Sequence, residues 1–203
     1  ALANLAEEGD FVEFNELKKI LMTKLTNKRY QHSLGVADTA ALLAKRFGCC
    51  IEKAKIAGLM HDCARAFSNE ELLLMANDLE IQVGAIERKS PVLLHAYVGA
   101  MIIEKNYGIF DVEIQQAIRN HTTGGKSMEL LDKIIYLADV IEPSRNFSGV
   151  EKLRELAKQD LDVAVLAALD QSIIHIIMQK GLVHPDTIFA RNELLLKDEY
   201  MDG

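Results

Sequence analysis

Apolar residues recur three and four positions apart along most of the chain, which is the spacing of amphipathic helices. The pattern predicts helices over residues 13–25, 28–47, 51–61, 94–107, 111–121, 128–141, 160–180 and 187–198. Two Ser-x-x-Glu capping boxes, beginning at Ser68 and Ser148, predict two further helix starts. Gly48, Gly108 and Gly181 each follow a predicted helix. The fold is therefore predicted to be all-α.

The helical pattern runs on without an internal repeat, a low-complexity tract or a linker. We expect a loose N-terminal leader over residues 1–12 and one compact helical domain over residues 13–198. The chain has 203 residues, of which 49% are hydrophobic, and that is enough to bury a core. Glycine and proline are scarce, whereas Ala, Leu, Ile, Glu and Lys dominate, which favours helix over strand.

Charge limits the kinds of partner. The net charge is −7, and the basic residues are dispersed rather than clustered. A nucleic-acid polymer is therefore not expected as a partner, because its phosphates need a basic patch. A small anionic substrate needs local help from a cation or a few arginines.

Cysteine usage indicates the compartment. The chain has three cysteines, Cys49, Cys50 and Cys63, with no Cys-x-x-Cys spacing. This argues against a disulfide framework and against a structural zinc site. The sequence shows neither a signal-peptide pattern nor 18 consecutive apolar residues. We expect a cytoplasmic protein that does not bind a membrane.

The chemistry centres on His61 and Asp62, adjacent residues at the end of an apolar predicted helix. Neighbours on a helix point about 100° apart, so both can touch one ion only near a helix terminus. Other predicted helices carry further candidates, namely His32, His95, His121 and Asp139. Imidazoles and carboxylates without thiolates suit hydrolytic iron, manganese or similar divalent sites. The ordered set predicts a metal site at the centre of the bundle.

Each candidate also has a simpler explanation. Asp139 would fit the exposed face of an amphipathic helix, but its apolar neighbours leave little polar face around it. His32 alone would be interpreted as a core histidine with a satisfied hydrogen bond. For His95 and His121, three roles stay open: second-metal ligands, phosphate-binding donors or ordinary helix-end histidines.

Two further histidines lie outside this set. His175 stands among isoleucines in the long helix and is interpreted as structural. His184 precedes a proline in a turn, where loop chemistry is the simpler explanation. Residues 122–126 contain two glycines and a lysine, but they lack the GxxxxGK[ST] pattern, so a P-loop is rejected.

Six stretches of the chain resemble one known family. They are residues 29–37, 58–65, 95–100, 119–122, 132–145 and 184–187. Together they resemble the HD-domain metal-dependent phosphohydrolases and, among these, the YqeK family of bacterial symmetrical diadenosine tetraphosphate hydrolases. The Tyr-Leu-Ala-Asp stretch that ends in Glu-Pro-Ser-Arg is the most specific part. The resemblance implies a single HD-domain helical bundle.

The resemblance also implies a ligand set and a reaction. The metal would be held by His32, His61, Asp62 and Asp139, with His61 and Asp62 as the catalytic pair. The ion would be iron, with manganese, cobalt or a similar ion as alternatives, and one or two ions would bind. A metal-activated water would cleave diadenosine tetraphosphate into two ADP. The alternatives are another nucleotide phosphohydrolase of the superfamily or a non-catalytic nucleotide-binding sensor.

The implied nucleotide site is larger. Its residues are Arg29, Arg65, Ala66, Phe67, Ser68, His95, His121, Thr122, Asp139, Arg145, Leu182, Val183, His184, Pro185, Asp186 and Thr187. A diphosphate product, ADP or GDP, would bind there too. Base preference and oligomeric state, a homodimer included, stay open at this point.

Overall fold

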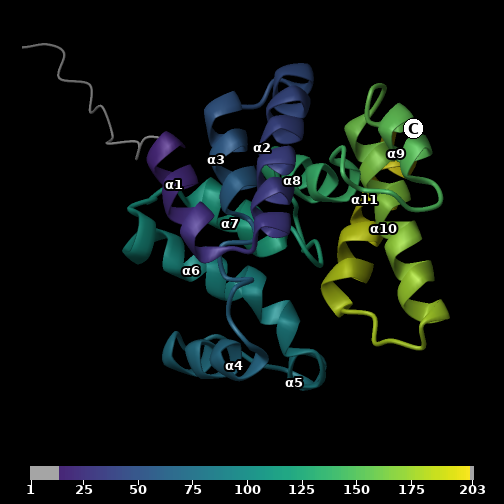
Figure 1. The fold of residues 1–203 in the computed structure, drawn as a ribbon. Helices are drawn as coiled ribbons and strands as arrows, with labels where there is room; N and C mark the ends of the chain where they lie inside the picture. The colour runs from purple at the N-terminus through teal and green to yellow at the C-terminus, as the bar shows by residue number, and fades with distance from the viewer. Residues whose placement is uncertain (1–13, 202–203) are drawn as a thin grey trace, which may run out of the picture.

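The computed structural model describes residues 14–201, with side chains described as far as residue 197, and every regular element in this range is a helix (Figure 1). The helices are α1 (Phe14–Lys24), α2 (Asn27–Phe47), α3 (Ile51–Met60), α4 (Asn69–Asp78), α5 (Ala85–Lys89), the 3₁₀ turn η1 (Pro91–Leu93), α6 (Leu94–Tyr107), α7 (Val112–Asn120), α8 (Leu130–Ile141), α9 (Val150–Leu156), α10 (Leu161–Met178) and α11 (Pro185–Met201). The all-α prediction is confirmed. The predicted leader, residues 1–12, lies outside the described residues.

One predicted capping box is present and the other is not. The Ser68 hydroxyl accepts the Glu71 backbone N–H at 3.2 Å, and the Glu71 carboxylate accepts the Ser68 N–H at 2.7 Å. Before α9, by contrast, the N-cap is Gly149 with φ 95°, and no side chain caps the helix. The Ser148 carbonyl instead accepts the Gln171 side-chain amide. The capping box predicted at Ser148 was therefore wrong, although a helix does begin two residues later, at Val150.

Two short elements and one helix start differ from the prediction. The sequence predicts neither α5 nor η1, because five and three residues are too few to show a helical period. The last helix starts at Pro185, two residues earlier than expected. Proline is favoured in the first turn of a helix, since its missing N–H would find no intrahelical partner there.

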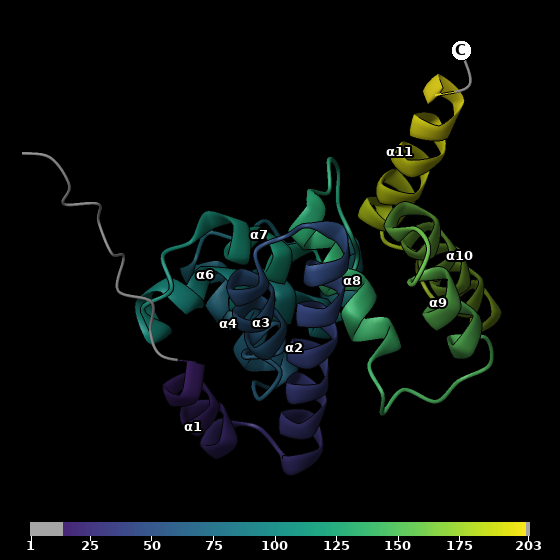
Figure 2. The same cartoon turned by 90° about the horizontal axis from the view of Figure 1, so that it is seen from above.

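Helix α8 organises the core. It lies between a group containing α2, α3 and α7 and a second group made of α9, α10 and α11 (Figures 1 and 2). Its residues 131–138 are all buried, so it contacts neighbours on every side. A helix at this position can present a side chain such as Asp139 to a site inside the bundle.

Gly58 lets α3 approach α2 closely. A Cβ atom at this position would lie 2.9 Å from the Ala37 Cα atom and 3.0 Å from its nitrogen, so any side chain would clash with the α2 backbone. The close approach brings His61, one turn further along, toward His32 on α2.

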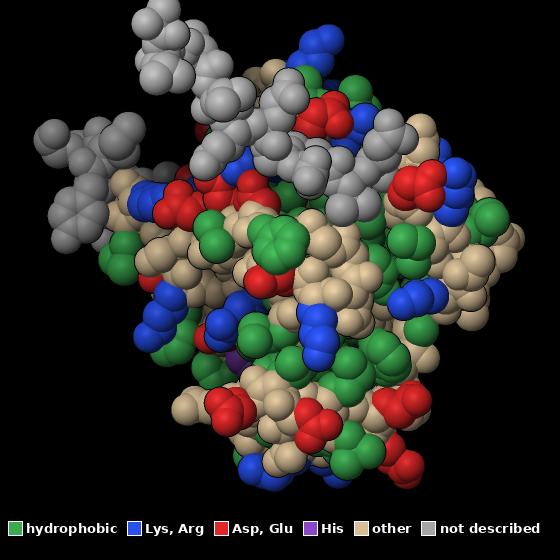
Figure 3. All heavy atoms as spheres, turned by 90° about the vertical axis from the view of Figure 1, so that its left-hand side faces the viewer, with side chains coloured by type: hydrophobic (Ala, Val, Ile, Leu, Met, Phe, Trp, Pro, Cys, Tyr) green, Lys and Arg blue, Asp and Glu red, His purple; other side chains and the backbone are tan. Residues whose placement is uncertain are grey.

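Charged side chains of both signs are mixed on the surface. On the face shown in Figure 3, Lys and Arg side chains are interspersed with Asp and Glu and separated by apolar groups.

By length and composition alone, α10 could cross a membrane, with a mean hydropathy of 1.7 over Leu161–Met178. One such helix is weak evidence, because core helices of soluble proteins meet the same criterion.

Candidate metal centre

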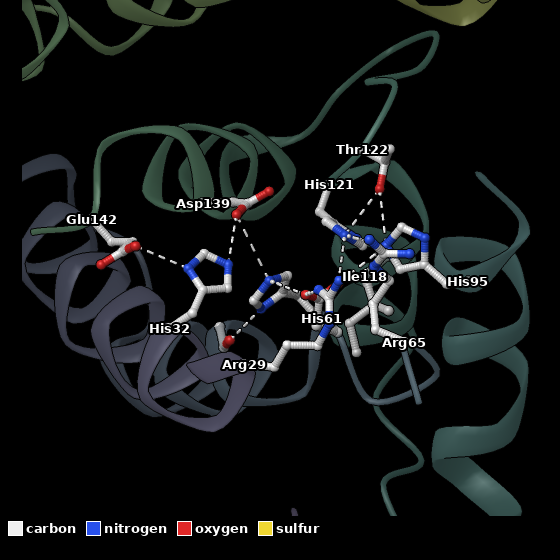
Figure 4. Close-up of polar contacts among 12 residues, drawn as sticks. Arg29, His32, His61, Arg65, His95, Ile118, His121, Thr122, Asp139 and Glu142 are labelled. Atoms are coloured by element: carbon white, nitrogen blue, oxygen red, sulfur yellow. Dashed lines mark hydrogen bonds and ion pairs between the residues drawn. The ribbon is translucent and has the colours of Figure 1, made fainter. Parts of the chain in front are cut away.

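Five segments bring the predicted ligand candidates together at the middle of the fold. His32 comes from the first turns of α2, and His61 and Asp62 from the end of α3. The others are His95 at the start of α6, His121 directly after α7, and Asp139 near the end of α8. In Figure 4 the four imidazoles form a row, with His32 beside Asp139 at one end and His95 and His121 at the other. We call this set of six residues the His/Asp centre.

Helix ends fix the orientation of three of the four imidazoles. In each case the ring Nδ1 lies against the backbone carbonyl three residues earlier. The distances are 2.7 Å from His61 to Gly58, 2.5 Å from His95 to Val92 and 2.6 Å from His121 to Ile118. A carbonyl can only accept, so each Nδ1 carries the hydrogen. In the neutral ring the Nε2 atom then has a free lone pair.

Glu142 has the same effect on the fourth imidazole. Its Oε1 atom accepts from His32 Nδ1 at 2.9 Å, and its side chain is almost fully buried. The carboxylate also accepts the backbone N–H of Ser144 at 2.7 Å. A Cβ atom at Gly35 would lie 2.7 Å from Glu142 Oε2, so the glycine leaves room for this contact. A carboxylate behind a ligating histidine is a frequent outer-shell arrangement at metal sites.

The four Nε2 atoms and two carboxylates converge on one another. Asp139 Oδ1 lies 2.9 Å from His32 Nε2 and 3.8 Å from His61 Nε2. Asp62 Oδ1 lies 3.2 Å from His95 Nε2 and 3.8 Å from His121 Nε2, and Asp62 Oδ2 lies 3.7 Å from His61 Nε2. Two overlapping triads have all ligand atoms within 4.8 Å of one another: His32, His61 and Asp139, and His61, Asp62 and His121.

This arrangement fits a divalent cation. Within the described part of the chain, the buried side-chain polar atoms without a hydrogen-bond partner are His61 Nε2 and Ser33 Oγ. A buried polar atom left without a partner costs about 1–3 kcal/mol. His61 Nε2 faces two carboxylates, which cannot donate a hydrogen. A cation bound by these groups would remove the penalty, and its ligand set would be all nitrogen and oxygen.

The charges of the centre follow from burial and from its neighbours. Burial would raise the pKa of the Asp62 carboxyl, but His61 and His95 hold it well below its usual range. The pKa of Asp139 is lowered in the same way, because His32, His61 and Arg145 outweigh its burial. Burial lowers the pKa of His121 to about 3, with His61 and His95 adding to the effect. Both carboxylates are therefore ionised and His121 is neutral at neutral pH.

Three arginines lie beside the carboxylates of the His/Asp centre. Arg29 Nη1 lies 3.2 Å from Asp62 Oδ2, and Arg65 Nε lies 3.9 Å from Asp62 Oδ1. The Arg145 Nε–H donates to the Asp139 backbone carbonyl at 2.7 Å, and its Nη2 contacts the Asp139 carboxylate. The Arg145 side chain is 40% exposed, so part of its guanidinium faces solvent.

Among the other residues predicted to bind the nucleotide, Thr122 contacts the His/Asp centre directly. The Thr122 hydroxyl lies 3.0 Å from His121 Nε2 and 3.3 Å from His95 Nε2, so it can donate to either. Ala66 is exposed and Phe67 half-buried in the connector to α4, and Ser68 is engaged in capping that helix.

Within the described residues, the turn 182–187 makes no hydrogen bond to the His/Asp centre. Leu182 and Pro185 are exposed, Val183 is half-buried and Thr187 is buried. The other two members contact groups outside the centre: Asp186 accepts from Tyr97 at 3.4 Å, and His184 pairs with Glu87 at 2.7 Å.

Sequence reasoning missed Glu142, Tyr97 and Glu87 as parts of this region. Glu142 lies in the Glu-Pro-Ser-Arg stretch, where an acidic residue three positions after Asp139 could have suggested it. Tyr97, two residues after His95, carried no signal of its own. Glu87 lies on the short helix α5 and contacts a residue 97 positions away, so no local pattern could reveal it.

A family model and a solved structure match this chain. The family model described as HD domain matches residues 29–144, a span that contains the whole His/Asp centre. A crystal structure from Clostridium acetobutylicum superposes with a TM-score of 0.88 and 42% sequence identity, covering 91% of this chain and 98% of that one. That protein is described as a predicted HD superfamily hydrolase involved in NAD metabolism.

Two curated relatives match over most of their length. A protein from Halalkalibacterium halodurans is 40% identical over 181 residues, which cover 89% of this chain and 96% of the relative. One from Bacillus subtilis is 38% identical over 172 residues, which cover 85% of this chain and 92% of the relative. Both are named bis(5'-nucleosyl)-tetraphosphatase, symmetrical.

Proposed function

The chain belongs to the HD domain family, and from this membership we infer that it is a symmetrical bis(5'-nucleosyl)-tetraphosphatase, which cleaves diadenosine tetraphosphate into two ADP. The observation that carries the inference is the convergence of four imidazole Nε2 atoms on two ionised carboxylates, with His61 Nε2 buried and without a hydrogen-bond partner. Such a set binds a divalent cation, as a metal-dependent phosphohydrolase requires.

We assign the ion to His32, His61, Asp62 and Asp139. When bound, the ion supplies Lewis-acid polarisation of a phosphoryl oxygen and a water of lowered pKa. The overlap of two triads at His61 leaves room for a second ion, for which His95 and His121 are the additional ligands. His95 Nε2 and His121 Nε2 lie 3.1 Å apart with both Nδ1–H groups committed to carbonyls, so two lone pairs face each other.

The chain's own groups bind and orient the polyphosphate. Arg29 and Arg65 lie beside Asp62 and Arg145 lies beside Asp139, and all three can neutralise phosphate oxygens in a protein of net charge −7. Asp62 is ionised and can accept a proton from the attacking water. The Thr122 hydroxyl, beside His95 and His121, can donate to a phosphate oxygen or to an imidazole.

The cleavage position gives a direct test. With diadenosine tetraphosphate in oxygen-18 water, we expect ADP as the product, with one label in half of the ADP molecules, because water attacks one of the two central phosphorus atoms. Mass spectrometry of the products reads both features. AMP plus ATP as the main products would contradict the symmetrical cleavage, and diguanosine tetraphosphate assayed in parallel would measure base preference.

We propose that the ion is iron. Histidine and carboxylate ligands without cysteine suit iron(II), although they also suit manganese and cobalt. We expect anaerobically purified enzyme to contain one or two iron ions per chain, measured by mass spectrometry of the metal content. Active enzyme that contains manganese or cobalt and no iron would contradict this assignment.

We also propose that residues 13–198 form a single hydrolase domain and that the enzyme works in the cytoplasm. One continuous apolar cluster, from Leu17 in α1 to Leu194 in α11, supports the single domain. The three cysteines are free thiols, which suits a reducing compartment.

We further place the nucleotide between the connector 65–68 and the turn 182–187, with its phosphates toward the His/Asp centre.

A further inference from the structure

Glu87 points inward from a helix that is otherwise at the surface. Its neighbours Ala85, Arg88 and Lys89 are exposed, whereas Glu87 is only 9% exposed. Its Oε1 atom lies 2.7 Å from Nε2 of His184, which is 8% exposed. Burial would raise the pKa of the Glu87 carboxyl, but the hydrogen bond from His184 and backbone N–H groups lower it. The buried carboxylate is therefore ionised and paired.

Both partners of this contact also cap a helix. The second carboxylate oxygen of Glu87, Oε2, lies close to Gly84, the N-cap of α5. A Cβ atom at Gly84 would lie 2.7 Å from this oxygen. His184 immediately precedes α11, and its Nδ1 accepts the Asp186 backbone N–H at 3.1 Å. An Nδ1 that accepts carries no hydrogen, so the Nε2–H of His184 donates to Glu87. One neutral tautomer satisfies both contacts, and two helix starts are joined by one hydrogen bond.

Helix α6 connects this pair to the His/Asp centre. Asp186, at the start of α11, accepts from the Tyr97 hydroxyl at 3.4 Å. Tyr97 lies on α6, two residues after His95, which belongs to the His/Asp centre. The turn 182–187 is thus held on one side by Tyr97 of α6 and on the other by Glu87 of α5.

We infer that Glu87 is a positioning residue of the nucleotide site: its carboxylate fixes the His184 imidazole and, through it, the turn 182–187 at the distance from the His/Asp centre that a nucleotide requires. The inference rests on the proposed function, in which this turn contacts the nucleotide. Glu87 itself touches neither the reacting phosphate nor the metal ligands. Its loss therefore weakens binding of the substrate and of the diphosphate product but leaves the chemical step intact.

The test is steady-state kinetics of the metal-loaded full-length enzyme. For Glu87→Ala we expect KM for diadenosine tetraphosphate to rise roughly tenfold, the scale of one lost charge-assisted hydrogen bond, while kcat stays within about twofold. Glu87→Gln keeps an acceptor for His184 and should restore most of the affinity. Arg88→Ala, an exposed change on the same helix, is the control and should behave as wild type.

A double-mutant cycle separates positioning from a general loss of α5 stability. If Glu87 acts through His184, then Glu87→Ala adds nothing to KM in a His184→Ala background. Additive effects of the two changes on KM, or a fall in kcat together with loss of bound metal, would overturn the inference. So would an unchanged KM in Glu87→Ala.

Calorimetric titration with ADP distinguishes this inference from the proposed function. Weaker ADP binding by Glu87→Ala than by wild type supports the positioning role even if wild type fails to cleave diadenosine tetraphosphate, a failure that would refute only the proposed reaction. Cleavage by wild type with equal ADP affinity in both proteins would refute the positioning role alone. A wild type that neither cleaves nor binds ADP would refute both.

Discussion

His61→Ala is expected to lower the hydrolysis of diadenosine tetraphosphate by more than about a thousandfold and to release most of the bound metal. His61 belongs to both ligand triads, so its loss weakens every ion position that the centre offers. Its Nε2 atom is buried without a hydrogen-bond partner, which is the state of a ligand atom rather than of a packed core histidine. Metal analysis and kinetics on the same preparation would test both parts.

His175→Ala is the matched control. His175 is exposed on α10, and within the described residues its side chain makes no contact with the His/Asp centre. This variant should keep its metal and its activity. Full metal occupancy in folded His61→Ala would contradict the ligand assignment, and lost turnover in His175→Ala would show that α10 contributes to catalysis.

The ligand candidates could be predicted because each breaks a simple pattern. Asp139 interrupts an apolar run in the most buried helix, where an unpaired carboxylate would be costly. His61 is followed directly by an aspartate at a helix end, and His121 stands at a helix end beside a loop. Both kinds of signal lie within a single predicted helix, so they can be found once the helical period has located that helix.

Contacts between distant segments could not be predicted in this way. The pairs His32 with Glu142 and Glu87 with His184 join residues 110 and 97 positions apart. Whether a glutamate faces solvent or a buried imidazole depends on tertiary packing, and such packing produces no periodic pattern in the sequence. Helix α5 has only five residues, so its one buried side chain shows no amphipathic pattern.

The false capping box at Ser148 has a backbone cause. The motif fits the residue types of a cap, but Gly149 adopts φ 95°, a conformation that glycine reaches at little cost. The helix then starts at Val150, one residue later than the capping box predicts, and the Ser148 side chain does not cap it. A glycine inside a capping motif therefore weakens the prediction of a helix start.

Arg145 occupies a turn that other residues hold rigid. The Arg154 guanidinium donates to the carbonyl of Arg145 at 2.9 Å and to those of Ile141 and Glu142 at 2.9 and 2.8 Å. Arg145 in turn donates to the Asp139 carbonyl at 2.7 Å, and its Nη2 lies 3.4 Å from His32 Nε2. Its guanidinium is therefore fixed at the edge of the His/Asp centre while remaining 40% exposed.

This placement gives the last prediction, that Arg145→Ala lowers kcat/KM for diadenosine tetraphosphate by about a hundredfold while the metal stays bound. The guanidinium can reach a phosphate oxygen, but it is no metal ligand. Arg145→Lys should recover only part of the rate, because an ammonium group cannot keep the Asp139 carbonyl contact and offer a planar fork to phosphate. Arg88→Ala controls for the loss of one surface arginine. Wild-type kinetics in Arg145→Ala would exclude the residue from phosphate binding, whereas loss of metal would mean that Arg145 orders Asp139 for the ion.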